Sequence, residues 1–160
     1  MGVARVLLIV IGAVLTLLGT YVFAVFNVGP GFVGSGLGFA MNLPDIIGID
    51  PGADAVVFYL FLVVFMIWLA SGVLQLVGIR SRIVGIIFSI FPFTIGLLFV
   101  LFMYTEILGM MTFVFMLFTT GEQFGGVYPI LVQLDVLGLG TYLLLGGGVL
   151  GIIGSSMSRD

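Results

Sequence analysis

The stretch "VVFYLFLVVFMIWLASGVLQLVG", residues 56–78, decides the fold of this chain. It contains no charged residue, and it is long enough for a helix to cross the hydrocarbon core of a bilayer, which takes roughly 20 residues. Backbone N–H and C=O groups in lipid must be satisfied within the segment, and a helix achieves this. The stretch therefore predicts a transmembrane helix.

Three more apolar runs of similar length occur along the chain, at residues 6–26, 83–104 and 130–154. The short polar segment that holds Arg80 and Arg82 leaves room only for a tight hairpin between the second and third runs. The four runs together predict an all-α integral membrane protein. We expect a four-transmembrane-helix bundle that forms a single domain over residues 1–160, with outer loops at 27–55 and 105–129.

The composition agrees with a membrane protein and removes most kinds of active site. Hydrophobic residues make up 62% of the chain and charged residues only 7%, whereas a soluble domain has about a quarter charged residues. The chain has no cysteine and no histidine, so it lacks thiolate nucleophiles and the commonest metal ligand and general base. We therefore expect no enzyme activity, no catalytic residue, no metal and no cofactor. Four basic residues and a net charge of -3 also argue against nucleic-acid binding.

The positions of the charged residues predict the orientation. In a four-span arrangement every arginine falls on one side, and the positive-inside rule assigns that side to the cytoplasm. Both termini are then cytoplasmic. The acidic residues fall on the outer side, apart from the terminal Asp160. The arginines are Arg5, Arg80, Arg82 and Arg159, and the outer acids are Asp45, Asp50, Asp54, Glu106, Glu122 and Asp135.

A fifth apolar segment, residues 107–118, is too short to span the membrane. As a helix it would be about 18 Å long. We expect it to be interfacial or re-entrant, or to contact a partner protein through Phe113, Phe115 and Met116, because aromatic rings and flexible thioethers adapt to a partner surface. A five-span alternative would move the end of the chain outside and Glu122 inside, against the charge distribution.

The stretch "GPGFVGSGLGF", residues 29–39, matches the nucleotide fingerprint G-x-G-x-x-G. That fingerprint binds phosphate only where it follows a strand and opens a helix. Here it follows a predicted span, and the next residues do not predict a helix. We therefore expect an apolar loop that uses glycine to bend over the outer end of the helices.

Small residues recur every four positions in three spans, and this spacing lets helix backbones approach closely. We expect close helix packing at Gly147, Gly151 and Ser155 in the fourth span, at Gly12 in the first, and at Gly85 and Ser89 in the third.

Polar residues near the start of the fourth span raise a second hypothesis. Gln133 and Asp135 would lie one to two turns inside that span, near Glu106 at the end of the third. Acidic residues within membranes are often functional, so these three could form a polar or ion site; the alternative is an acidic helix end at the interface.

We expect a structural or accessory subunit that packs in the lipid bilayer with other membrane subunits or with itself. It would belong to a respiratory or envelope complex, or to the membrane of a lipid-containing virus. All basic residues are arginine, a usage typical of haloarchaeal and other high-GC sequences. The alternative is a small channel or transport component for an ion or small solute, with a pore lined by Ser71, Gln75, Thr94, Gln133 and Asp135.

Overall fold

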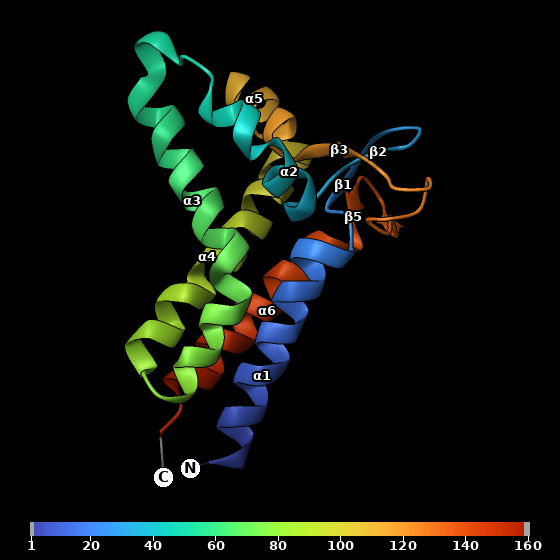
Figure 1. Ribbon diagram of the computed structural model, residues 1–160. Coiled ribbons are helices and arrows are strands. Elements are labelled where there is room, and N and C mark those ends of the chain that lie inside the picture. The colour runs from blue at the N-terminus through green and yellow to red at the C-terminus, as the bar shows by residue number, and fades with distance from the viewer. Residues whose placement is uncertain (1, 159–160) are drawn as a thin grey trace.

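The computed structural model describes residues 2–158, and four long helices dominate it (Figure 1). All four are long and apolar enough to cross a membrane. They are α1 (Val3–Leu17, continued by the π-helical turn Leu18–Val22), α3 (Ala55–Leu74, continued by the 3-10 helix η3, Gln75–Ile79), α4 (Arg82–Tyr104) and α6 (Leu139–Ser156).

The long helices do not pack in chain order. α1 packs on α6, α6 packs on α4, and α4 packs on α3. The start of α1 and the end of α6 lie at one end of the molecule, together with the hairpin between η3 and α4 (Figure 1). We call this the termini end and the opposite end the sheet end.

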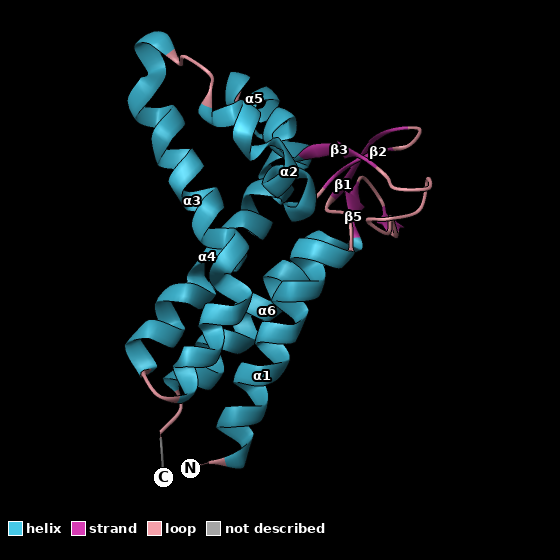
Figure 2. Ribbon diagram, viewed as in Figure 1, coloured by secondary structure: helices cyan, strands magenta, loops and turns pink. Residues whose placement is uncertain are grey.

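A small antiparallel sheet lies at the sheet end, beyond α1 and α6 (Figure 2). Its strand order is β3-β2-β1-β5-β4, so residues far apart in sequence meet in it. The prediction of an all-α protein is therefore wrong for this part of the chain. The strands are β1 (Phe26–Gly29), β2 (Phe32–Gly34), β3 (Thr120–Glu122), β4 (Gln133–Leu134) and β5 (Leu137–Gly138).

The predicted fourth span, residues 130–154, begins nine residues too early, because α6 starts at Leu139. Most of the preceding residues are apolar, but their backbone groups bond to other segments. The N–H of Ile130 donates to the carbonyl of Val22 (2.8 Å), and its own carbonyl accepts from Ala24 (2.9 Å). Between β4 and β5, Asp135 adopts a φ of 62°, which a helix cannot accommodate. Hydropathy alone cannot distinguish such short apolar strands from the first turns of a helix.

Two short helices lie beside α3 and α4 at the sheet end, α2 (Gly36–Ile47) and α5 (Met110–Thr119) (Figure 1). The predicted outer loop at 27–55 is therefore largely structured, since it holds the β1–β2 hairpin and α2. The predicted short segment at 107–118 forms α5, which packs against α2.

The hydrophobic core lies where these two short helices meet α3 and α4, and it is mainly aromatic. Phe115 of α5 contacts Phe61 of α3 and Phe102 of α4, with ring centroids 4.4 Å apart in both pairs. Buried aromatic pairs in such tilted and edge-on arrangements add about 0.5–1.5 kcal/mol each beyond the burial of their surface. This aromatic cluster fixes α2 and α5 to the long helices, and thereby positions the sheet.

Candidate functional site

The glycine-rich stretch forms the hairpin between β1 and β2 and then leads into α2. The prediction that it does not open a helix is therefore wrong. Gly31 takes a φ of 78° at the turn. The hydroxyl oxygen of Ser35 accepts from the N–H of Gly38 (2.9 Å) and caps the helix. A Cβ on Gly36 would lie 2.6 Å from the carbonyl oxygen of Thr20, so this helix end is packed against α1. The glycines provide a turn and close contacts.

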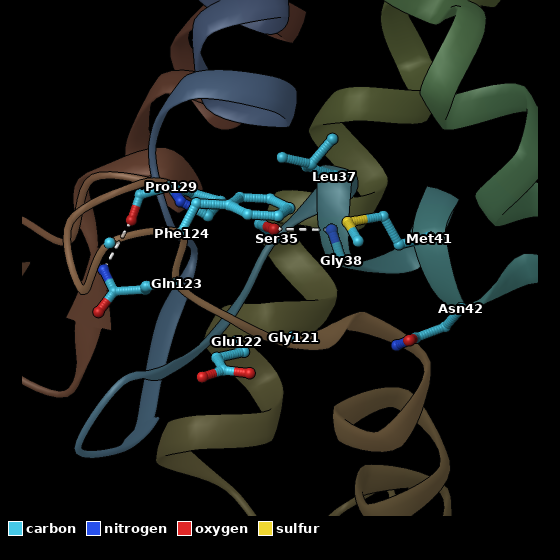
Figure 3. Close-up of a pocket in the computed structure, with 11 residues that line it drawn as sticks. Ser35, Leu37, Gly38, Met41, Asn42, Gly121, Glu122, Gln123, Phe124 and Pro129 are labelled. Atoms are coloured by element: carbon cyan, nitrogen blue, oxygen red, sulfur yellow. Dashed lines mark hydrogen bonds between the residues drawn. The ribbon is translucent and has the colours of Figure 1, made fainter.

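A pocket of about 390 Å³ lies between the first turns of α2 and the segment that follows β3 (Figure 3). Leu37 and Met41 of α2 lie on one side, and Phe124 lies on the other. The volume falls in the range of small-molecule and side-chain pockets. The other lining residues are Ser35, Gly38, Asn42, Gly121, Glu122, Gln123, Gly125 and Pro129.

Hydrogen bonds hold the two walls of this pocket. The side-chain N–H of Asn42 donates to the carbonyl of Thr120 (2.7 Å), which ties α2 to β3. The side-chain N–H of Gln123 donates to the carbonyl of Pro129 (2.7 Å), which closes the 123–129 turn. The side-chain N–H groups of Asn42 and Gln123 thus bond to the backbone of the same chain. Glu122 is exposed, and no described side chain or backbone group pairs with its carboxylate, so it is the charged group that the pocket offers to a ligand.

The sequence analysis did not predict this pocket, because its lining comes from two segments that lie about 80 residues apart in the chain. Glu122 was recognised only as an outer acid. One signal was present: Glu122 is the only charged residue between positions 107 and 134. A single charge within a long apolar stretch indicates either solvent exposure or a partner.

The small residues predicted to pack do lie at helix contacts. A Cβ on Gly12 would lie 2.8 Å from both the carbonyl oxygen of Gly147 and the N–H nitrogen of Gly151. Ser89 lies against Gly151, and Ser155 lies against Gly85. The first set joins α1 to α6, and the second joins α4 to α6, so α6 touches two neighbours through its backbone.

Buried polar side chains lie next to these helix contacts. The hydroxyl of Thr16 donates to the side-chain oxygen of Gln75 (3.2 Å), and neither residue is exposed to solvent. The side-chain nitrogen of Gln75 and the hydroxyl of Ser155 have no hydrogen-bond partner among the described residues. Gln75, one of the residues predicted to line a pore in the channel alternative, therefore links η3 to α1.

Arg5 lies inside α1 and is fully buried, although the prediction placed it just before the first span. Its guanidinium donates to the carbonyls of Gly78 (2.5 Å) and Ile79 (3.2 Å) at the end of η3. Helix ends leave carbonyls without partners, and a cation there also interacts favourably with the helix dipole. Arg5 therefore completes the C-terminal end of a neighbouring helix.

Two of the three residues of the predicted polar or ion site are joined, because the side-chain N–H of Gln133 donates to the backbone carbonyl of Asp135 (2.9 Å). Gln133 and Asp135 lie in the β4–β5 hairpin and not inside a span, so the prediction that placed them within the membrane helix is wrong. The hydroxyl of Tyr104 donates to Asp135 (2.6 Å), and Asn27 donates to Gln133 (3.4 Å). Glu106 makes no hydrogen bond with either of them among the described residues.

The predicted partner residues on α5 have different surroundings. Phe113 is 69% exposed, Phe115 is 1% exposed, and Met116 packs against the aromatic core. The prediction that Phe115 contacts a partner is wrong, because neighbouring helices of the same chain already cover it. Phe113 belongs to an exposed apolar face of α5, to which Ile107, Met110 and Leu117 also contribute.

A second exposed apolar surface covers the sheet and its turns; we call it the cap patch. Phe32 in β2 is 46% exposed, and Val127 in the turn after β3 is 64% exposed. The full set is Val28, Phe32, Phe124, Val127, Tyr128, Ile130, Val132, Leu134 and Val136.

No family model, curated protein or solved structure matches this chain.

Proposed function

We propose that this chain is a non-enzymatic structural or accessory subunit of a larger membrane assembly, and that its partner covers the cap patch. The supporting observation is the position of that patch. The spans Val3–Val22 and Leu139–Ser156 have 20 and 18 residues. At 1.5 Å per residue these lengths match a hydrocarbon core of about 30 Å and leave little helix beyond it. The sheet lies past the ends of these two spans, and we place Phe32 and Val127 there outside the lipid chains.

Exposed apolar patches outside the bilayer generally mark interaction sites. The exposed side chains on the four long helices have a simpler occupant, because lipid covers them. The cap patch lacks such cover, so we assign it to another protein.

The charge distribution supports the rest of the arrangement. Arg80 and Arg82 lie at the termini end, whereas Glu122 and Asp135 lie at the sheet end. We therefore propose a four-helix bundle with both termini in the cytoplasm and the sheet outside. The membrane is then a cell membrane or a virion membrane.

A small channel or transport component is the alternative. Close backbone packing supports the structural role over a pore through a single chain, because Gly12, Gly147 and Gly151 fill the contact between α1 and α6 without leaving space for a side chain. Two of the five predicted pore residues, Gln133 and Asp135, also lie in the hairpin.

Copurification from native membranes in a mild detergent tests the proposal. We expect the wild-type chain to copurify with a partner in fixed stoichiometry, and Phe32→Ala with Val127→Ala to release it. The matched control is Leu60→Ala with Val63→Ala, two residues exposed on the lipid-facing side of α3. Retention of the partner by the cap variant, or equal loss in both variants, would count against the role of the cap patch.

A further inference from the structure

We infer that the pocket beside β3 receives an extended, basic segment of a partner chain, which adds to the open edge of the sheet and places a Lys or Arg side chain beside Glu122. This inference rests on the proposed function, because the added strand comes from a partner. Three features of the pocket support it: the open strand edge, the charge, and the apolar walls.

The backbone of Glu122 faces the open edge. In an antiparallel pair, alternate residues direct their N–H and C=O groups toward the neighbouring strand and away from it. Ser35 donates to the carbonyl of Thr119 (3.0 Å), and Gln123 donates to the carbonyl of Gly31 (2.8 Å), so the odd-numbered residues of this segment face β2. Thr120 and Glu122 therefore face outward.

Asn42 already covers the first of these two outward positions, because it donates to the carbonyl of Thr120. Only the backbone groups of Glu122 remain open at this edge. An extended peptide can satisfy both of them, as in β-strand addition. A lipid headgroup or a small amine could neutralise the carboxylate of Glu122. Neither has a peptide backbone that could bond to the N–H and C=O groups of Glu122 and extend the sheet. This difference favours a peptide.

The charge of the sheet end requires the partner segment to be basic. Every described acidic residue lies at this end, whereas Arg5, Arg80 and Arg82 lie at the termini end. A second copy of this chain docked through the same face would bring acid against acid, which is unfavourable. A different chain that carries Lys or Arg would find a complementary potential.

The walls of the pocket suit the stem of such a side chain. Leu37, Met41 and Phe124 supply apolar surface, and the methylene groups of Lys or Arg pack on such surfaces while the charged group stays near water. Because Glu122 is exposed, the charged group can reach its carboxylate without full desolvation.

The test uses the purified chain in phosphatidylcholine nanodiscs and fluorescent peptides, with binding measured by anisotropy. We expect a peptide of alternating valine and lysine to bind saturably, and one of alternating valine and glutamate not to bind. Glu122→Gln should weaken binding about tenfold, as expected for the loss of one charge-assisted contact. Asp54→Asn, which removes an exposed acid outside the pocket, should leave binding unchanged. N-methylation of alternate peptide bonds should abolish it.

Several results would overturn the inference. Equal weakening by Glu122→Gln and Asp54→Asn would indicate general charge attraction, and binding that survives N-methylation would exclude strand addition. Loss of peptide binding when phosphatidylethanolamine is added to the nanodiscs would identify a lipid headgroup as the occupant. If the peptide does not bind but the Phe32 and Val127 substitutions still release a copurified partner, the pocket assignment is wrong and the accessory role stands. If no partner copurifies at all, the accessory role fails, whatever the peptide does.

Discussion

Gly12 of α1 lies directly against Gly147 of α6, and a Cβ atom added to Gly147 would lie 2.8 Å from the carbonyl oxygen of Gly12. The neighbouring Gly146 differs, because a Cβ there would meet only Leu15, at 3.8 Å. Two adjacent glycines of one helix therefore face different surroundings.

We predict that Gly147→Ala destabilises the protein by about 1–3 kcal/mol, because the added methyl group forces the two backbones apart. Gly146→Ala should be neutral or stabilising by up to about 1 kcal/mol, since alanine loses less entropy in a helix. Trp68 is the only tryptophan and is fully buried, so its fluorescence can follow unfolding in mixed micelles. Equal stability of the two variants would show that α1 and α6 can move apart without a loss in the free energy of unfolding.

The second prediction concerns Arg5 and the end of η3. Arg5→Lys keeps the charge but loses the planar fork that reaches two carbonyls, so at least one of them is left without a partner. We expect a loss of about 1–3 kcal/mol in the free energy of unfolding. Arg82→Lys is the control, because Arg82 is exposed at the same end of the molecule. A stable Arg5→Lys variant would mean that water or lipid headgroups satisfy these carbonyls equally well.

The third prediction concerns the turn at Asp135. Its φ of 62° suits asparagine, whose side chain can also accept the hydrogen bond from Tyr104, so Asp135→Asn should change stability by less than about 0.5 kcal/mol. Asp135→Val should cost about 1–2 kcal/mol, because a β-branched residue is strained there. The comparison is made by the same Trp68 fluorescence measurement. Similar values for both variants would indicate that the hairpin turn adapts.

The sequence predicts the four long helices well, because each apolar run must satisfy its own backbone in lipid. It fails at residues 130–138, where the same hydropathy belongs to strands whose hydrogen-bond partners lie more than 100 residues away, at Val22 and Val25. Local periodicity contains no information about such partners. The same reason applies to α2: its N-cap Ser35 is visible in the sequence, but its packing on Thr20 and Thr119 depends on glycines that also look like a flexible loop.

The candidate site follows the same pattern. The residue types alone predict that the acidic residues and the arginines lie at opposite ends of the molecule. They also predict close packing at Gly147 and Gly151. The pocket could not be predicted, because it exists only once β3 pairs with β2 and α2 packs beside β3. The partner hypothesis for α5 used Phe113 and Phe115 together, although a helix places residues two apart on different faces.

The fourth prediction tests the orientation. The chain has no cysteine, so single cysteines can be introduced without background. In intact cells, an impermeant thiol reagent should label Asp54→Cys at the sheet end and should not label Ser81→Cys in the hairpin between η3 and α4. Asp54 is exposed, so a cysteine at this position is accessible to the reagent. Permeabilised cells, in which both should react, are the control. Labelling of Ser81→Cys alone in intact cells would reverse the proposed topology.

The last prediction separates the two aromatic residues of α5. Phe115→Ser removes a ring from the core and buries a hydroxyl, so it should destabilise the protein by about 3–5 kcal/mol. Phe113→Ser replaces an exposed ring and should leave the free energy of unfolding within about 0.5 kcal/mol of the wild type. If the exposed face of α5 contacts a partner, Phe113→Ser should also reduce copurification, whereas lipid contact alone should leave copurification intact. A stable Phe115→Ser variant would contradict the placement of α5 against α3 and α4, and would remove the basis on which Phe113 was assigned to the exposed face.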